Sequence, residues 1–436
     1  MKKLKTAVAV LLCFVFILPL LVSCGEKDEP KKDEITTVSG ENPGDDSKDE
    51  NDSSDNKPDE KDPNEPNFPG IDMNGKIFTI LSLGTDGDPN ITDIVTEELN
   101  ADPVNDAAYN RLMKVENMYN IKLKQVNAGD NEETLNAYRT SILANDGAYD
   151  VAITRCGNFT SLLSGNYLVD FKDLTYLDVD KPYWNKNFYD SMALIGKNYA
   201  MDGDVSKRRL ECVWIMAFNK DLIQINDFES PYDLVKDGRW TYDKMHEMAR
   251  SAAKDVNGDG VMDFDADLWG INYTGDTIMG IINCSGVKFA EINSKGVPEF
   301  TINTEANLEK LLRIYTDMRD HTYSIDTLFQ VGGGVTGLGD VDVFADNRCL
   351  FLACATHNIS YNENTNNTQS LRTMEVNLGI IPYPKWDLAQ ADYLPHTAGG
   401  YYPVMTIPQT NYDLENTAII LETLAYEGMK NISPVF

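Results

Sequence analysis

The sequence has little basic charge and few long apolar runs. Its 436 residues carry 38 Lys and Arg against 69 Asp and Glu, which gives a formal net charge of −31 at pH 7. A strongly acidic surface repels phosphate backbones and anionic lipids, which argues against nucleic acid as a partner. Past the N-terminus, no apolar run is long enough to span a bilayer. Any attachment to a membrane is therefore expected to come from the N-terminus.

Cysteine is also scarce, and its spacing fits neither a disulfide framework nor a zinc site. The chain has seven cysteines, and those beyond residue 150 are widely and irregularly spaced, with no CxxC pair or Cys/His cluster. We interpret these later cysteines mostly as buried apolar side chains, and the alternative is that two of them form one disulfide. No GxSxG motif occurs and no carboxylate pair stands out, so we expect no enzyme.

The N-terminus has the pattern of an export signal. Three lysines within the first five residues precede the apolar run Ala7–Val22, which is short for a spanning helix. The run ends in Leu21-Val22-Ser23-Cys24, which resembles the bacterial lipobox. We therefore predict a signal peptide over 1–23, palmitate or a related lipid on Cys24, and an extracytoplasmic protein anchored to the cell membrane. The alternative is an ordinary signal peptide with a chance cysteine.

The next segment, 24–70, is predicted to be a disordered acidic linker. From Gly25 it holds 16 acidic and six basic residues, and almost no aliphatic ones. Such a composition cannot bury enough apolar surface to offset its ordering entropy. Repulsion between the acidic groups should keep the linker extended.

The remainder, Ile71–Phe436, is too long for one core and indicates two lobes. Its beginning alternates between strand and helix patterns: a strand at 76–81, a helix at 104–119, a strand at 121–126, a helix at 132–143 and a strand at 149–154. This order predicts an α/β fold with a parallel sheet and helical crossovers. Ligands bind beyond the carboxyl ends of such strands, where the loop Arg155–Phe159 is expected.

Short motifs then follow in a specific order. They are Tyr183-Trp184-Asn185-Lys186, the stretch 197–204 (KNYAMDGD), Phe218-Asn219-Lys220-Asp221-Leu222, Tyr232-Asp233-Leu234-Val235, Gly238-Arg239-Trp240-Thr241, the stretch 255–260 (DVNGDG) and the stretch 378–385 (LGIIPYPK). In order and spacing they resemble the extracellular solute-binding proteins of ABC importers, in the sugar-binding group that includes maltose-binding protein. The resemblance covers Ile71–Phe436.

The resemblance implies a two-lobe periplasmic-binding-protein-like fold that closes about a hinge. Lobe 1 is expected over 71–205 with about 353–396 returning, and lobe 2 over 206–352 with about 397–436 returning. Crossings between the lobes are expected near Asp204–Cys212, Leu352–His357 and His396–Tyr402. Members usually continue for several tens of residues past a helix such as Asp413–Tyr426, so lobe 2 is expected to be truncated at Phe436.

The resemblance also implies a function. The protein would capture a carbohydrate or oligosaccharide outside the membrane and deliver it to ABC permease subunits, without catalysis. A surface glycan-binding lipoprotein that has no permease is the alternative. Aromatic rings stack on sugar faces and polar groups pair with hydroxyls, although any one aromatic can equally belong to the core. The expected ligand-binding residues are Arg155, Asn158, Phe159, Asp204, Trp214, Tyr273, Asp276, His357, Tyr401 and Tyr402.

A loop after the predicted helix Trp240–Lys254 has the spacing of a calcium site. Oxygen ligands of Asp255, Asn257, Asp259, Val261 (carbonyl) and Asp263 occupy positions 1, 3, 5, 7 and 9, with Gly260 at position 6. Position 12 is Ala266 where an acid is expected, so a neighbouring Asp would have to replace it. We predict a structural Ca²⁺ here and no other cofactor, and the alternative is a metal-free Asp/Asn/Gly turn.

Overall fold

The computed structural model describes residues 62–82, 94–273, 275–326, 342–360, 371, 374–397 and 402–436. The signal peptide, Cys24 and nearly all of the linker lie outside these residues, so the predictions for them stay predictions. Of the helices in the described part, none has both the length and the apolar character needed to cross a membrane.

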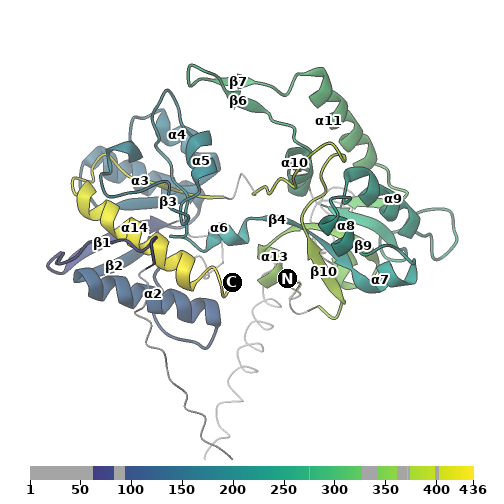
Figure 1. Cartoon of the computed structure of the whole chain (residues 1–436), viewed down its shortest axis with the longest axis horizontal. Coiled ribbons are helices and arrows are strands. Elements are labelled where there is room, and N and C mark those ends of the chain that lie inside the picture. Colours follow the sequence, from purple (N-terminus) through teal and green to yellow (C-terminus); the bar gives the residue numbers. More distant parts are fainter. Residues whose placement is uncertain are drawn as a thin grey trace, which may run out of the picture. The chain divides into compact units, whose positions relative to one another are not determined.

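The first sheet has the strand order β11-β3-β1-β2, in which β1, β2 and β3 are parallel and β11 is antiparallel to β3 (Figure 1). We call this sheet and its helices the first lobe. Its elements are β1 (Lys76–Ser82), α2 (Pro103–Tyr119), β2 (Ile121–Asn127), α3 (Asn131–Ala144), β3 (Val151–Arg155), η3 (Cys156–Asn158), α4 (Phe159–Leu163), η4 (Phe171–Asp173), α5 (Lys186–Ser191), β11 (Pro403–Thr406) and α14 (Leu414–Asn431).

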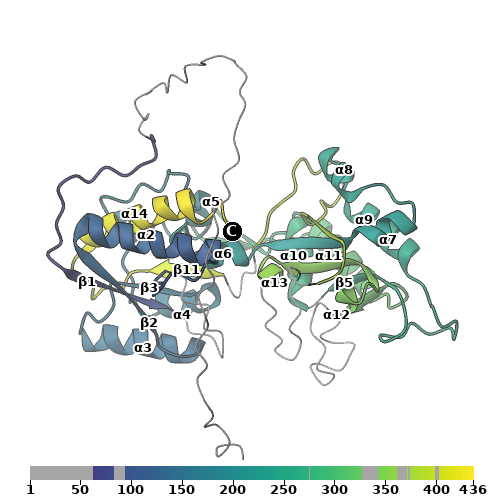
Figure 2. The same ribbon diagram turned by 90° about the horizontal axis from the view of Figure 1, so that it is seen from below.

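Local signals fix the helices of the first lobe. The carboxylate of Asp102 accepts from the backbone amides of residues 104 and 105 and caps α2, which has Pro103 in its first turn. Asn120 ends this helix in the left-handed conformation, with φ 52°. Asp130 and Glu133 form a capping box at the start of α3. Helices α2 and α14 pack together on one face of the sheet, and α3 covers the other (Figure 2).

The second sheet has the order β10-β4-β9-β5-β8, with β5 parallel to β8 and β9 and with β4 antiparallel to β9 and β10. We call it and its helices the second lobe. Its elements are β4 (Trp214–Asn219), α7 (Lys220–Ile225), α8 (Pro231–Lys236), α9 (Tyr242–Ala252), β5 (Trp269–Tyr273), α10 (Gly275–Cys284), β6 (Ala290–Ile292), β7 (Pro298–Phe300), α11 (Glu305–Met318), β8 (Ser324–Asp326), α12 (Asp342–Ala345), β9 (Cys349–Ala355), α13 (His357–Ser360) and β10 (Leu378–Ile381).

The returning segments belong to the lobes opposite to those predicted. The segment 353–396 stays with the second sheet, because β10 pairs with β4 in the register Ile380↔Ala217. The segment after 402 returns to the first sheet, because β11 pairs with β3 and α14 packs on α2. The prediction was wrong here, since chain order does not specify which strand edge is free to pair.

Two connections therefore link the described strands of the two sheets. One runs through α6 (Arg208–Glu211), and the other lies between β10 and β11. They run antiparallel where Val213 bridges Thr397. The expected crossing at Leu352–His357 is wrong, because β9 and β10 lie in the same sheet.

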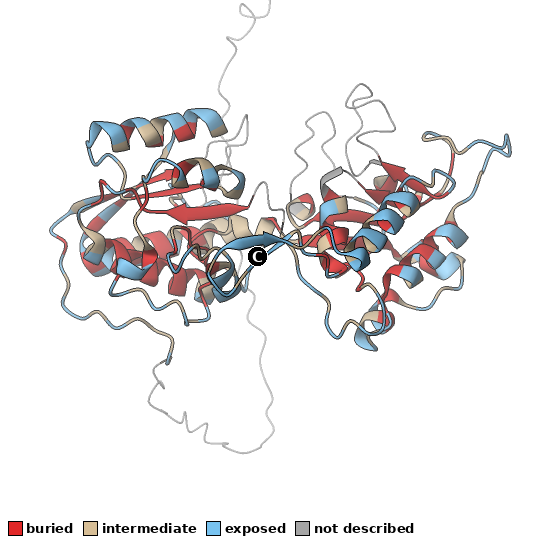
Figure 3. Cartoon of the chain, turned by 90° about the horizontal axis from the view of Figure 1, so that it is seen from above, coloured by how far each residue is buried: buried red, intermediate tan, exposed pale blue. Residues whose placement is uncertain are grey.

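Burial follows the expected amphipathic pattern (Figure 3). Trp240 and Trp269, for example, are both buried. All five described cysteines are free, and only Cys156 is not fully buried. Their interpretation as mostly buried apolar side chains is confirmed.

The last part of the predicted linker is placed against the first lobe. The Tyr426 hydroxyl donates to Asp62 Oδ2 over 3.0 Å, and Lys181 Nζ donates to the carbonyl of residue 63 over 3.0 Å. The rings of Phe68 and Tyr176 make an edge contact at 5.7 Å. The prediction of disorder over 24–70 is therefore corrected for 62–70, whose aromatic ring and backbone find partners.

Candidate functional site

The carboxyl ends of the parallel strands in the first sheet carry polar side chains, which are neutral except for Arg155. Strands β1, β2 and β3 end at Ser82, Asn127 and Arg155, and the loop Arg155–Phe159 follows β3 as expected. Gln125 Nε2 donates to Ser82 Oγ over 2.8 Å, and that hydroxyl donates to Asn127 Oδ1 over 2.5 Å. We call this set, with Asn131 and Asn158, the amide edge.

Asn158 extends the amide edge from the loop after β3. It is half-buried, and its Oδ1 accepts from Asn131 Nδ2 of α3 over 3.1 Å. Phe159 is buried in the core beneath the loop, so we assign it to packing. Arg155 is half-buried at the strand end. Amides that both donate and accept, at the end of a parallel sheet, can pair with hydroxyl groups of a ligand.

Tyr402 lies beside the amide edge, where its hydroxyl and its ring already contact other residues of the first lobe. Its hydroxyl donates to the carboxylate of Asp202, which also accepts from Asn185 Nδ2 over 2.8 Å. Burial raises the pKa of Asp202. The ring of Tyr402 is buried and lies 5.8 Å from that of Phe188. We therefore assign Tyr402 to packing; its predicted neighbour Tyr401 lies outside the described residues.

Asp204 secures the first connection between the sheets. Its Oδ1 accepts from Arg209 Nη2 over 2.7 Å and from Ser433 Oγ over 2.9 Å. The backbone carbonyls of Asp204 and Val205 accept from Arg111 Nη1, over 3.3 and 2.7 Å. The side chain is buried. We infer that this carboxylate holds the connection in place and does not contact a ligand.

The second sheet brings three predicted residues to one edge. Strands β5 and β9 are parallel and end at Tyr273 and Ala355, beside His357, and β4 begins there with Trp214 opposite Ala355. Tyr273 is 1% exposed, and its hydroxyl donates to Ser324 Oγ over 3.4 Å. The ring of Tyr273 is thus occupied by packing, whereas His357 is half-buried and remains a candidate.

Trp214 packs tightly under α10. A Cβ added at Gly280 would meet the Trp214 ring at 3.0 Å and the Tyr383 ring at 2.6 Å, so the helix can approach only because this residue is glycine. Near Trp214, Asn283 Nδ2 lies 2.7 Å from His396 Nε2, and burial lowers the pKa of this histidine. The side chain of Asp276, at the start of α10, lies outside the described residues.

Sequence reasoning missed most of the amide edge. It named Asn158 but not Ser82, Gln125, Asn127 or Asn131. The signal was present for two of them, because Ser82 and Asn127 follow directly after the predicted strands 76–81 and 121–126. Gln125 lies inside β2 and Asn131 begins α3, so a search at strand ends would not have found these two.

The predicted calcium loop is held by its own backbone amides. The Asp255 carboxylate accepts from the amides of Gly258, at 2.7 Å, and Gly260, at 2.8 Å, and Gly260 has φ +87° as the turn requires. Asp267 is buried and accepts from the amides of residues 256 and 263, so it closes the loop in place of Ala266. Within the described residues, no three His, Cys, Asp or Glu side chains converge as metal ligands. The Ca²⁺ site therefore stays a prediction.

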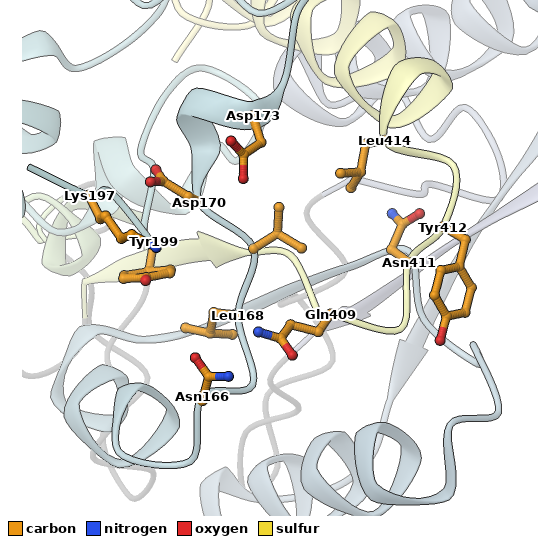
Figure 4. Close-up of a pocket in the computed structure, with 11 residues that line it drawn as sticks. Asn166, Leu168, Asp170, Asp173, Lys197, Tyr199, Gln409, Asn411, Tyr412 and Leu414 are labelled. Carbon is orange, nitrogen blue, oxygen red and sulfur yellow. The ribbon is translucent and has the colours of Figure 1, made fainter.

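A separate cavity of about 460 Å³ lies elsewhere on the first lobe (Figure 4). It is lined by the segments 166–173, 197–199 and 409–414. Because β11 is antiparallel to β3, the segment after Thr406 lies at the amino end of β3. Asn411 Nδ2 accordingly donates to the carbonyl of Asp150 over 2.9 Å. This cavity is thus at the edge opposite the amide edge, and the sequence analysis did not predict it.

Comparison with known proteins gives structural matches only: no family model and no curated protein matches. A cyclo/maltodextrin-binding protein complexed with maltotetraose matches at a TM-score of 0.52 and 10% identity, over 82% of this chain and 78% of that one. M. tuberculosis UspC matches at a TM-score of 0.51 and 13% identity, over 81% of this chain and 78% of that one. A family 1 extracellular solute-binding protein from Alicyclobacillus acidocaldarius matches at a TM-score of 0.50 and 11% identity, over 82% of this chain and 77% of that one. The chain has the two-lobe α/β fold of extracellular solute-binding proteins, as predicted.

Proposed function

We propose that this chain is the substrate-binding component of an ABC importer and captures a carbohydrate or oligosaccharide outside the membrane. The observation that carries the proposal is the amide edge at the carboxyl ends of the first sheet. Its side chains are neutral and can both donate and accept hydrogen bonds, which suits hydroxyl groups of a sugar. The fold supports the same function, since one structure that shares it is described as complexed with maltotetraose.

The proposed mechanism is closure about the two connections between the sheets. A ligand that contacts both the amide edge of the first lobe and His357 of the second lobe would bind the closed state more tightly than the open one. It would therefore favour the closed state, because only a difference in affinity for two states can shift their equilibrium. Hinges of this kind absorb the movement in a few connecting residues while each lobe moves as a rigid body. The closed form would then deliver its ligand to permease subunits, and no catalytic step is involved.

The experiment that tests this function is a thermal-shift screen of mono- and oligosaccharides on the purified protein. A sugar that binds the native state raises the melting temperature by mass action. Asn158→Ala should weaken binding of that sugar by about 1 kcal/mol. Asn187→Ala, an exposed amide of α5 outside the edge, is the matched control. Binding to insoluble glycan with no shift by any small sugar would instead favour a surface glycan-binding lipoprotein.

We also propose that Cys24 carries a lipid that anchors the protein outside the cytoplasm. The basic N-terminus, apolar run and lipobox-like residues before Cys24 support this. Cys24→Ser should move the protein from the membrane fraction to the soluble fraction, as detected by immunoblotting. Ala7→Val, a change within the apolar run, should leave the fractionation unchanged. Detergent-dependent membrane association of the serine variant would contradict the anchor.

A further inference from the structure

The cavity on the first lobe has walls that are fixed by internal hydrogen bonds. Asp170 Oδ1 accepts from the amides of residues 172 and 198, over 3.1 and 3.0 Å. Asn411 Nδ2 donates to Thr417 Oγ1 over 2.8 Å, in addition to its bond with residue 150. The Tyr412 hydroxyl donates to Asn145 Oδ1 over 2.6 Å. The hollow is therefore part of the folded lobe, and its shape does not depend on a bound molecule.

Other polar side chains in this cavity are not used by the fold. Asn166, Asp173, Lys197 and Gln409 line it and make no side-chain hydrogen bond or ion pair with the described part of the chain. Among the described residues, Lys197 makes a long contact with Tyr199, its Nζ lying 5.9 Å from the centroid of the ring. Figure 4 shows the two amides on one side of the hollow and Asp173 on the other. The cavity therefore presents donors and acceptors that a ligand can use.

The composition of the lining selects a class of ligand. Asp170 and Asp173 outweigh Lys197 in charge, so an anionic molecule is disfavoured. Free amides and carboxylates can pair with hydroxyl groups, and the Tyr412 ring, 79% exposed, offers a face for C–H stacking. The volume of about 460 Å³ falls within the range of roughly 300–1,000 Å³ that is usual for small-molecule pockets.

We propose that this cavity is a second carbohydrate site, which binds a short stretch of a neutral polysaccharide. It lies at the amino end of the first sheet, so it is separate from the amide edge and does not rest on the proposed transport function. An open surface site of this kind holds part of a longer chain with low affinity. It would keep the protein close to a glycan while the amide edge remains free.

Affinity gel electrophoresis of the full-length protein in detergent tests this proposal. Native gels contain soluble starch, mixed-linkage β-glucan or galactomannan, and a gel with polygalacturonate supplies an anionic polymer. At least one neutral polysaccharide should retard the protein, and the double variant Asn166→Ala with Gln409→Ala should bind it about tenfold more weakly. The double variant Asn187→Ala with Gln224→Ala changes two exposed amides outside the cavity, and it should migrate like the wild type.

Three results would overturn the second site. The first is that no neutral polysaccharide retards the wild type, and the second is that only polygalacturonate does. The third is that the Asn166 and Gln409 double variant is retarded as strongly as the wild type. Stabilisation by small sugars is measured separately, so failure of the transport function and failure of the second site give different results.

Discussion

The first lobe buries two carboxylates of α14 that meet donors from other elements, whereas the core of the second lobe contains large aromatic side chains. In the first lobe, Glu422 accepts from the Tyr183 hydroxyl over 2.5 Å and from Trp184 Nε1 over 2.8 Å, while Glu427 pairs with Lys114. In the second lobe, Trp240 is fully buried with its ring 5.3 Å from that of Phe351.

This difference shows how α14 is held in place. Buried carboxylates on that helix must meet specific donors, because an unpaired buried charge is costly. The helix therefore has one register on the first sheet. Apolar packing in the second lobe is less directional and tolerates changes that conserve volume. The two lobes should accordingly respond to different substitutions and to pH in different ways.

The largest expected effect is in the second lobe. Trp240→Ala removes a buried ring and leaves a cavity, so it should lower the free energy of unfolding by about 3–5 kcal/mol. Urea denaturation monitored by circular dichroism measures the change. Trp240→Phe keeps much of the volume and should cost less. A loss below 1 kcal/mol for the alanine variant would contradict the view that packing stabilises this lobe.

A somewhat smaller loss is expected from Glu422→Ala in the first lobe. It leaves the hydroxyl of Tyr183 and the indole N–H of Trp184 buried without their acceptor, and should cost about 2–3 kcal/mol. Glu422→Gln retains an acceptor and should cost less in the same denaturation experiment. Equal losses in the two variants would mean that side-chain volume matters here and the acceptor does not.

The pH dependence should distinguish the lobes by sign. Burial lowers the pKa of His246, in the second lobe, from 6.5 to about 3. The unfolded chain then binds more protons between these values, so stability rises with pH by up to about 1.4 kcal/mol per unit and levels off above 6.5. His246→Gln should lose this slope in unfolding measurements between pH 4 and 8. The exposed His321→Gln should keep it, and an unchanged slope in both variants would refute the assignment.

Glu422 should act in the opposite direction. Burial raises its pKa above the ordinary value of 4.5, so the native state holds its proton more tightly than the unfolded chain does. Its contribution to stability is therefore full below 4.5 and is lost as pH rises through the folded pKa. The difference between wild type and Glu422→Gln, measured against pH, should slope opposite to that for His246→Gln.

The smallest expected effect concerns the loop after α9. A bound Ca²⁺ would add an ionic element to the second lobe, and a chelator would then lower the melting temperature by a few degrees, about 1 kcal/mol. Asp255→Ala with Asp259→Ala should abolish that sensitivity. Glu309→Ala, which changes an exposed acid of α11 outside the loop, serves as control. A wild type that is indifferent to chelator would identify the loop as a turn without metal.

Much of the fold was predictable from local pattern. The strands at 76–81 and 121–126 and the helices at 104–119 and 132–143 lie within a residue or two of their observed bounds, because periodicity and caps are local. Sheet membership of 378–381 and 403–406 depends on pairing with distant strands, which local pattern does not contain.

The position of the candidate site in the fold could be predicted from the sequence, but the side chains that line it were harder to predict. The rule that ligands bind beyond the carboxyl ends of parallel strands led to Arg155–Phe159. It did not show that Trp214 is buried, because that depends on how closely α10 approaches at Gly280, and it did not show that Tyr273 is buried. Access to a side chain is a tertiary property, so residue type alone could not separate ligand contacts from packing.

The docking of residues 62–70 on the first lobe also has a mechanical consequence. A pull on the N-terminal segment enters the folded protein at Asp62, Phe68 and their partners Tyr426 and Tyr176. Tyr426 belongs to α14, which packs on α2 and is tied to it by the Glu427–Lys114 ion pair. Tension would therefore enter the first lobe and reach the second lobe through the two connections and through the bond from the Ile195 amide to the Gly296 carbonyl, 3.1 Å long. A load on this segment would thus act on the first lobe before it acts on the second.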